Sequence, residues 1–191
     1  MKLLEERIVK DGYWVGKGIL KVDCFLNHQV DIELMDQIGE EVARLYADEK
    51  IDKILTAETS GIAIACSVAR AMDYTPMVFA KKNKPITMTD EFYRAEAKSF
   101  TKGTDNSLCV SKRYLNEGEN ILIVDDFLAR GESGSALCDL VVQAGGHIVG
   151  YTAVIEKLEQ ERAKKISEKY GCPVKSLAVI EQVEGEKITF K

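Results

Sequence analysis

Two adjacent carboxylates follow a strongly apolar run of the chain. The run Ile121-Leu122-Ile123-Val124 leads directly into Asp125 and Asp126, and a short turn then reaches a helical pattern that begins at Ser133. Ionised carboxylates accept hydrogen bonds only, so they suit a ligand with hydroxyl donors, such as a ribose. The backbone N–H groups of the turn and of the helix start suit a phosphate just beyond. The segment therefore predicts a ribose 5-phosphate site. The alternative is that the acids merely end a strand and the serine is a plain N-cap.

A second polar turn, from Glu58 to Gly61, joins a predicted strand to an almost wholly apolar helix. The hydroxyls of Thr59 and Ser60 and the successive N–H groups can form a cup for pyrophosphate, and the glycine permits close approach of the backbone. A Ser/Thr cap without any ligand explains the same residues equally well.

A lysine-rich segment, Lys81-Lys82-Asn83-Lys84, opens a long polar stretch that ends near Ala97. Stretches of this kind often form lids over a site. Lys81, Lys82 or Lys98 could supply cations to an anionic leaving group, and the sequence does not choose among them. A solvated charge run is the ordinary alternative.

The elements that must position these turns are strands alternating with segments of helical period. Helices are predicted at 1–11, 62–72, 133–144 and 158–170, with one more that is capped by Asp31 and reaches 46. Strands are predicted at 19–22, 53–57, 76–80, 120–126 and 147–155, with a hairpin of 98–101 with 108–111 and a terminal strand pair within 174–190. Continuous apolar strands separated by helices indicate an α/β fold, a central, mostly parallel twisted sheet with helices on both faces. Such sheets bind ligands beyond the carboxyl ends of their strands, where the three turns would meet.

The composition of the 191 residues is that of an ordinary globular protein, with 46% hydrophobic and 30% charged residues. A net charge of -5, from 26 basic and 31 acidic side chains, argues against bulk nucleic-acid binding. Five isolated cysteines and two histidines offer little material for a zinc site, a disulfide framework or a Ser-His-Asp relay. The charged N-terminal segment and the lack of an apolar run of about 20 residues predict a cytoplasmic protein that does not bind membranes.

The segment 121–133 resembles the fingerprint of the type I phosphoribosyltransferases, a hydrophobic strand, two acids and a short turn with Gly into a helix. The segments 20–29, 125–129 and 155–157 are similar to those of the bacterial xanthine phosphoribosyltransferases, and the likeness extends essentially from end to end, including 79–82 and 99–102. Two positions depart from the wider family. Arg130 stands where many members have Thr, and Ala129 where several 6-oxopurine enzymes have a third acid, so the proton acceptor for the purine stays open.

The resemblance implies the type I phosphoribosyltransferase fold, as a single domain over 1–191 with a small hood from about 1–30 and 172–191. It also implies a homodimer that acts in purine salvage on xanthine and phosphoribosyl pyrophosphate (PRPP), with Mg²⁺ bound to PRPP and no metal ligand assigned to the chain. By this resemblance, Asp125 and Asp126 are the catalytic residues, which bind the ribose hydroxyls, and the purine is bound by Leu20, Asn27 and Lys157. The 5-phosphate is bound by Ala129, Arg130, Gly131, Glu132 and Ser133. The pyrophosphate is bound by Glu58, Thr59, Ser60, Gly61, Lys81 and Lys82.

The chemistry of each side chain implied to bind the purine can also be considered by itself. An ammonium on Lys157 can donate to the 6-oxo group of the base, although a salt bridge with Glu156 or Glu159 is equally consistent. Asn27 offers both donors and an acceptor, as reading a purine edge requires, but Asn before a helix is often a cap. Leu20 can cover the ring face or simply belong to the core.

In the implied reaction, the 9-nitrogen of xanthine displaces pyrophosphate from carbon 1 of PRPP with inversion. The transition state would resemble an oxocarbenium ion, so catalysis would come from positioning and from stabilising the charge of the departing pyrophosphate. Two other classes compete with this interpretation. A regulator that senses PRPP and binds nucleic acid generally needs a basic surface or an added module. A receiver domain would carry its paired acids near the N-terminus.

Overall fold

The structure, a computed structural model of the whole chain, describes residues 1–15, 19–82, 91–97, 106–128, 133–157, 161–184 and 187–191. The α-helices are α1 (Lys2–Asp11), α2 (Ile32–Leu45), α3 (Ser60–Ala71), α4 (Ser133–Ala144) and α5 (Arg162–Tyr170), and a π-helical turn, η1, spans Asp23–Asn27. The strands are β1 (Tyr13–Val15), β2 (Ile19–Lys21), β3 (Lys53–Ala57), β4 (Met77–Lys82), β5 (Phe92–Ala97), β6 (Asn106–Ser111), β7 (Asn120–Leu128), β8 (His147–Lys157), β9 (Val174–Glu184) and β10 (Lys187–Phe190).

The main sheet has the strand order β10-β9-β8-β7-β3-β4-β6-β5. The five strands from β9 to β4 are parallel, whereas β10 at one edge and β6 and β5 at the other are antiparallel. From β3 the chain passes through α3 to β4 on one side, and later resumes on the other side of β3 with β7, α4, β8, α5 and β9. The order therefore reverses between β3 and β7, and ligands of open α/β sheets bind at such a switch point.

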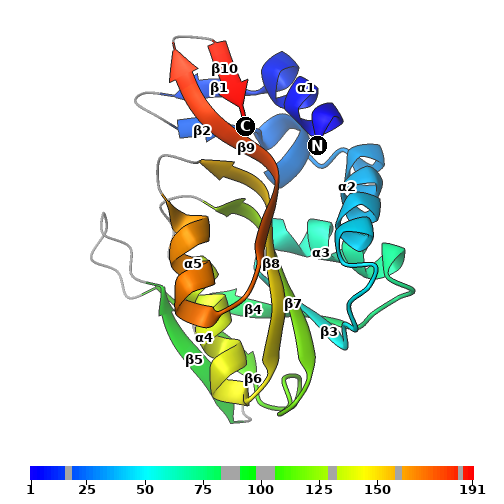
Figure 1. Cartoon of the computed structure of the whole chain (residues 1–191), viewed down its shortest axis with the longest axis vertical. Coiled ribbons are helices and arrows are strands. Elements are labelled where there is room, and N and C mark those ends of the chain that lie inside the picture. The colour runs from blue at the N-terminus through cyan, green and yellow to red at the C-terminus, as the bar shows by residue number, and fades with distance from the viewer. Residues whose placement is uncertain (16–18, 83–90, 98–105, 129–132, 158–160, 185–186) are drawn as a thin grey trace.

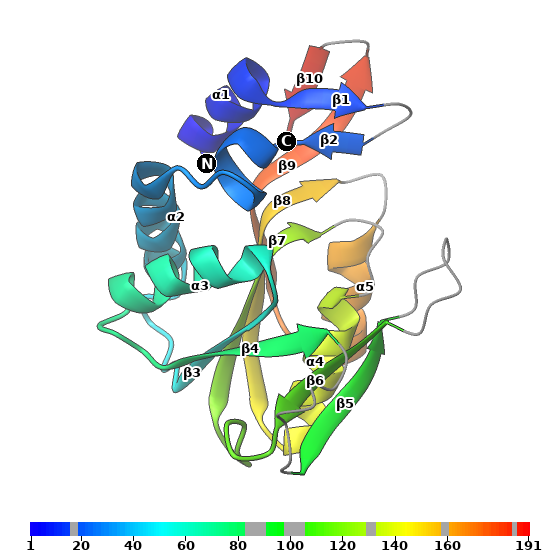
Figure 2. The same cartoon turned by 180° about the vertical axis from the view of Figure 1, so that it is seen from behind.

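Helices cover both faces of this sheet, as the sequence predicts. Figure 2 shows α2 and α3 on one side and α4 and α5 on the other. The buried apolar side chains form two corresponding clusters, one that includes residues of α2 and α3 and one that includes residues of α4 and α5. The strands β3 and β7 between them are mainly apolar in their buried middle parts, because both of their faces are covered. The predicted α/β fold is confirmed.

The two ends of the chain meet beyond the carboxyl ends of β7 and β8 (Figure 1). Leu4 and Ile8 of α1 belong to the same buried cluster as Leu177 and Ile180 of β9. The N-terminal amino group also donates a hydrogen bond to the carbonyl of Leu177. The antiparallel pair β1–β2 lies beside this cluster, so segments far apart in sequence stand over the same edge of the sheet.

The largest difference from the sequence-based expectation lies in the polar stretch 81–97. The structure continues β4 through Lys82 and forms the edge strand β5, which pairs with β6; residues 98–101, expected to form that hairpin, lie outside the described residues. Ala95 and Ala97 are buried, while Arg94 and Glu96 point outward. This alternation is that of a strand, but small Ala side chains give it little hydrophobic signal.

Elsewhere, β7 and β8 are two residues longer than predicted, and α5 begins at Arg162.

No helix within the described ranges is long and apolar enough to cross a membrane.

Gly39 lets α2 approach α3 at backbone distance. A Cβ atom added at this buried position would lie 2.5 Å from the carbonyl oxygen of Ser67 on α3. We expect Gly39→Ala to lower the free energy of unfolding by about 1–3 kcal/mol, because the helices must separate and this outweighs the better helix propensity of Ala. Urea unfolding measures the change. Glu40→Ala, at the exposed neighbouring position, is the control and should stay within about 0.5 kcal/mol of the parent protein. Equal stability of the two variants would contradict close packing of the helices.

Candidate functional site

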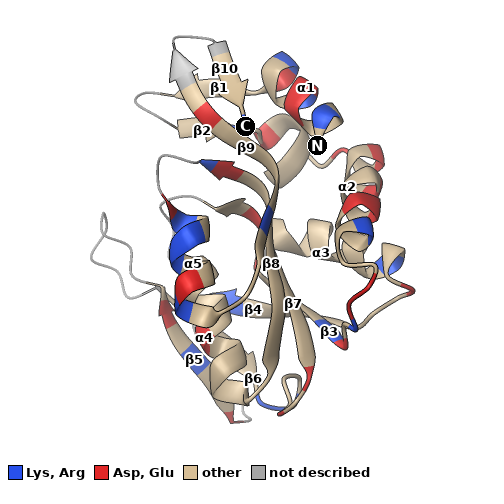
Figure 3. Ribbon diagram, viewed as in Figure 1, with Lys and Arg blue, Asp and Glu red and all other residues tan. Residues whose placement is uncertain are grey.

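The two predicted acids stand at the end of β7, beside the switch point of the sheet. Asp125 is buried, with 6% of its surface exposed, and Asp126 is half-buried. Successive side chains of a strand point to opposite faces, so the two carboxylates lead away from each other. Figure 3 shows acidic residues at this end of β7 and both charges at the neighbouring end of β8.

Asp125 is held from inside the protein. The hydroxyl of Tyr151 on β8 donates to Oδ2 of Asp125 at 3.0 Å, and the backbone N–H of Asp126 donates to Oδ1 at 3.0 Å. Burial, together with the negative charge of Asp126, raises the pKa of Asp125 from 3.8 to about 7, although the hydrogen bond from Tyr151 acts in the opposite direction. The carboxyl group therefore changes its charge near neutral pH.

Asp126 faces a residue from the other end of the chain. The side-chain amide of Asn27, at the end of η1, donates to Oδ2 of Asp126 at 3.2 Å. The backbone N–H of Phe127 donates to Oδ1 at 2.9 Å. The cap of α2 is Asp31, whose side chain accepts from the N–H of Leu34, so Asn27 does not serve as that helix cap. The structure thus brings Asn27 and the acids together at one place.

Lys157 ends β8 and is 7% exposed. Its ammonium group lies 4.9 Å from the centre of the Trp14 ring, a cation–π contact. The neighbouring Glu156 accepts a hydrogen bond of 2.6 Å from the hydroxyl of Ser176. Glu159, the other acid weighed for this lysine, lies outside the described residues.

Trp14 is a residue that the sequence reasoning missed. On the β1–β2 hairpin it pairs directly with Leu20, which is buried with 7% exposure, so the indole adjoins two of the three predicted purine residues. The available signal was that this is the single tryptophan of the chain.

The turn after β3 is tied to the end of β4. The N–H of Lys82 donates to a carboxylate oxygen of Glu58 at 2.5 Å, and the N–H of Glu58 donates to the carbonyl of Ala80 at 2.9 Å. The Glu58–Thr59 peptide bond is cis. Helix α3 starts at Ser60, two residues earlier than predicted, and a Cβ at Gly61 would collide with the hydroxyl of Thr56. Because β3 is parallel to β7, the turn lies at the same end of the sheet as the two acids.

Other predicted residues lie at the start of α4 and near the end of β4. Ser133 is the first residue of α4 and is half-buried. Lys81 is half-buried with its ammonium 5.9 Å from the ring centre of Phe79, and Lys82 is exposed. The predicted phosphate residues Ala129, Arg130, Gly131 and Glu132 lie outside the described residues, as does Lys98.

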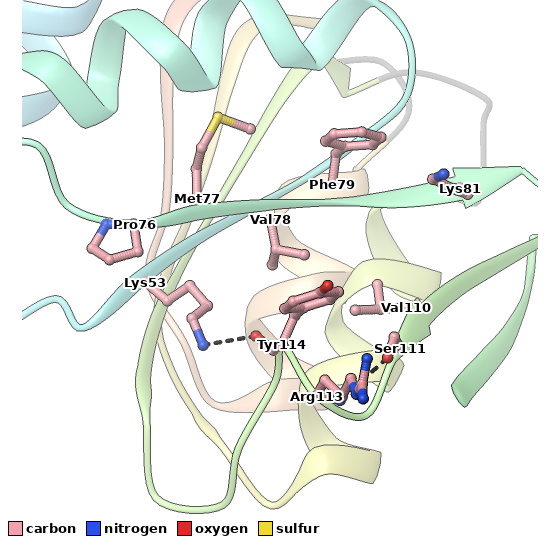
Figure 4. Close-up of a pocket in the computed structure, with 10 residues that line it drawn as sticks. All are labelled: Lys53, Pro76, Met77, Val78, Phe79, Lys81, Val110, Ser111, Arg113 and Tyr114. Carbon is pink, nitrogen blue, oxygen red and sulfur yellow. Dashed lines mark hydrogen bonds between the residues drawn. The ribbon is translucent and has the colours of Figure 1, made fainter. Parts of the chain in front are cut away.

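A cavity of about 490 Å³ lies where β4 and β6 diverge, since these strands pair only at Lys81 and Lys82 (Figure 4). Lys53, in its wall, is bonded to Glu119 and to the carbonyl of Tyr114. Of the predicted site residues that the structure describes, Lys81 alone lines this cavity; the described lining consists of Lys53, Pro76, Met77, Val78, Phe79, Lys81, Val110, Ser111, Arg113 and Tyr114. The cavity is therefore separate from the group around the two acids.

Among the described residues, no three or more His, Cys, Asp or Glu side chains form a cluster that could hold a metal ion. Both acids of β7 already accept hydrogen bonds from the protein. A magnesium ion at this edge would need most of its oxygen ligands from a bound phosphate compound, as is usual for Mg²⁺.

Comparison with known proteins gives a consistent picture. The sequence pattern of the phosphoribosyl transferase domain matches residues 27–189. "Xanthine phosphoribosyltransferase 1" of Clostridium perfringens is 46% identical over 191 residues, the whole of both chains. "Xanthine phosphoribosyltransferase" of Leuconostoc mesenteroides is 47% identical over 190 residues, again with 100% coverage of both.

Solved structures resemble the fold at lower sequence identity. An adenine phosphoribosyltransferase from Rhodothermus marinus matches with a TM-score of 0.75 and 19% identity, covering 94% of this chain and 100% of that one. An adenine phosphoribosyltransferase from Trypanosoma brucei, in complex with AMP, pyrophosphate and ribose-5-phosphate, matches with a TM-score of 0.77 and 16% identity, covering 92% of this chain and 78% of that one. At these identities the likeness concerns the fold.

The raised pKa of Asp125 predicts a pH-dependent cost to stability. Because the folded state binds this proton more tightly than the unfolded state does, stability falls as the pH rises from about 4 to about 7. We expect Asp125→Asn to raise the melting temperature by several degrees at pH 8 and to change it little near pH 4.5. Differential scanning calorimetry at both pH values measures this. Glu117→Gln, at an exposed acid, is the control. An Asp125→Asn effect that is the same at both pH values would show that the carboxyl is not protonated in the folded protein.

Proposed function

Because the chain belongs to the phosphoribosyl transferase family, we propose that it is a xanthine phosphoribosyltransferase. It transfers the 5-phosphoribosyl group from PRPP to the 9-nitrogen of xanthine and releases xanthosine 5'-monophosphate (XMP) and pyrophosphate, a pentosyl transfer of purine salvage. The observation that carries this proposal is the 46–47% identity over the whole length of relatives that bear this name. The type I phosphoribosyltransferase fold accords with it.

The ribose 5-phosphate half of the substrate fits the end of β7 and the start of α4. Asp125 and Asp126 accept hydrogen bonds from the ribose hydroxyls, since carboxylates are acceptors. Residues 129–133 then hold the 5-phosphate, with Ser133 at the N-terminus of α4, where N–H groups and the helix dipole favour an anion. The buried strands on either side fix these groups on a rigid edge.

The base lies on the other side of the acids. The ammonium of Lys157 donates to the 6-oxo group, and Leu20 covers the ring. The amide of Asn27 reads position 2, where xanthine, hypoxanthine and guanine differ. A donor that points at the 2-oxo group disfavours hypoxanthine, because that base leaves the donor unpaired. The hydrogen bond from Asn27 to Asp126 supports only the placement of Asn27 beside the proposed ribose site.

The leaving pyrophosphate meets residues 58–61 and the lysines at the end of β4. The N–H groups of the turn, with Lys81 and Lys82, stabilise the charge that develops as the bond to carbon 1 breaks. A Mg²⁺ ion bound to PRPP would offset the negative charge of the departing pyrophosphate, beside residues 58–61 and the lysines of β4. The residues of the chain act by positioning PRPP and the base for displacement with inversion, so no covalent nucleophile is needed.

We also propose that residues 1–191 form one phosphoribosyltransferase domain in which about 1–30 and 172–191 make a hood over the base. The packing of α1 against β9 supports this arrangement. A homodimer in the cytoplasm, without membrane or nucleic-acid partners, completes the proposal. The exposed rings of Phe79 and Tyr114 are apolar surface that a second copy could cover.

The activity is tested by pyrophosphate release from PRPP with xanthine, hypoxanthine, guanine and adenine in turn. We expect the highest kcat/KM with xanthine and loss of activity when EDTA removes Mg²⁺. Preference for adenine would contradict the substrate assignment. If no pyrophosphate is released with any of the four bases, the result would favour a PRPP-sensing regulator.

The purine site is tested by Lys157→Ala and Asn27→Ala. Each variant should lower kcat/KM for xanthine by roughly 5- to 150-fold, because the loss of one paired polar contact costs about 1–3 kcal/mol. Initial rates at varied xanthine and saturating PRPP measure this. Lys164→Ala, at an exposed position of α5, is the matched control and should leave kcat/KM unchanged. A change within about twofold for Lys157→Ala or Asn27→Ala refutes the role of that residue.

A further inference from the structure

The hydroxyl of Tyr151 lies under the candidate site, where no substrate can reach it. Tyr151 is 0% exposed, and its hydroxyl donates to Oδ2 of Asp125 at 3.0 Å. The two residues stand on neighbouring strands, and Asp125 pairs in register with Ala153, two residues beyond the tyrosine. The second oxygen of the carboxylate accepts from the backbone N–H of Asp126. Both oxygens are therefore oriented by the protein before any ligand arrives.

The same hydroxyl also touches the start of α4. A Cβ atom added at Gly134 would lie 2.8 Å from the Tyr151 oxygen, so only glycine lets the first turn of the helix pack on this group. Gly134 directly follows Ser133, at the proposed 5-phosphate site. One buried hydroxyl thus contacts the acid proposed to bind the ribose and the helix turn proposed to bind the phosphate.

We propose that Tyr151 is a positioning residue for PRPP: its hydroxyl orients Asp125 toward the ribose hydroxyls and holds that acid in register with the N-terminus of α4. The inference rests on the proposed function, because it assigns Asp125 to the ribose. Tyr151 acts through Asp125 and α4 and does not touch the substrate.

The charges around Asp125 accord with this role. Asp126 on the same strand disfavours ionisation of Asp125, whereas the Tyr151 hydrogen bond favours it. From α4, Cys138 lies near Tyr151, and burial raises the pKa of its thiol, which stays neutral. Burial and Asp125 raise the pKa of Tyr151 well above 10, so its hydroxyl remains a donor throughout the working range. Without this hydroxyl, Asp125 would ionise only at higher pH.

Tyr151→Phe tests the proposal, with Tyr46→Phe as the matched control. Tyr46 is 3% exposed, and its hydroxyl accepts from Thr152, the residue next to Tyr151 on β8, whose side chain points to the opposite face. Both variants remove one buried tyrosine hydroxyl beside the same strand. Only Tyr151→Phe removes a bond to Asp125.

The readouts are kcat/KM for PRPP over roughly pH 5.5–9 and the dissociation constant of Mg²⁺–PRPP by calorimetry over the same range. For Tyr151→Phe we expect the acid limb of both profiles to move to higher pH, with PRPP affinity about tenfold weaker at pH 7 and largely recovered at pH 9. The KM for xanthine at saturating PRPP should stay within twofold of the parent protein. Tyr46→Phe should keep the parent pH profiles.

An acid limb that does not move, or a loss for both substrates that is equal at every pH, would overturn the positioning role and leave Tyr151 as a packing residue. If the parent protein forms no XMP, the proposed function fails separately. The calorimetric pH profile of PRPP binding then still decides the role of Tyr151.

Discussion

Two neighbouring carboxylates at the mouth of a buried strand repel each other and lose hydration, and this constraint organises the site. Because successive side chains of a strand point to opposite faces, the carboxylate of Asp125 points into the protein and that of Asp126 points away from it, which separates the two charges. Inside, burial favours the protonated carboxyl near neutral pH, and Tyr151 supplies a hydrogen bond that favours its charge. Outside, the amide of Asn27 and a backbone N–H compensate Asp126. The acids are thus chemically different although they are adjacent in sequence.

The partners of these acids come from segments that only the sheet topology brings together. The reversal of strand order between β3 and β7 places the turn after β3 beside the end of β7. The parallel pairing of β7 with β8 brings Tyr151 beneath Asp125 and carries Lys157 past the same edge. The N-terminal segment, packed on β9, brings Asn27 and Trp14 over it from the far side. Each of these contacts depends on the buried, two-sided sheet.

The sequence predicted those features that carry their own local signal. The strand 53–57 and the helix 133–144 begin and end where expected, because an apolar run and a 3.6-residue period need no tertiary information. The strand Phe92–Ala97 was missed, because alanines buried against α4 look like polar-loop composition. The acids of β7 were identified by their motif. Tyr151 could not be, because in sequence it is one more aromatic residue of an apolar strand and its role depends on the register with β7.

The net charge of -5 is a poor guide to how such a site receives an anion. The stretch from Lys81 to Arg113 carries eight Lys and Arg against four Asp and Glu, whereas the rest of the chain is strongly acidic. Within this stretch, Lys112 is paired with Glu91 at 2.9 Å, which leaves the local excess of positive charge unchanged. Backbone N–H groups at the turn after β3 and at the start of α4 can add to these cations in binding an anion. A focused site of this kind can hold a small, highly charged anion in an acidic protein. A polyanion would instead need a broad basic surface, which the composition does not provide.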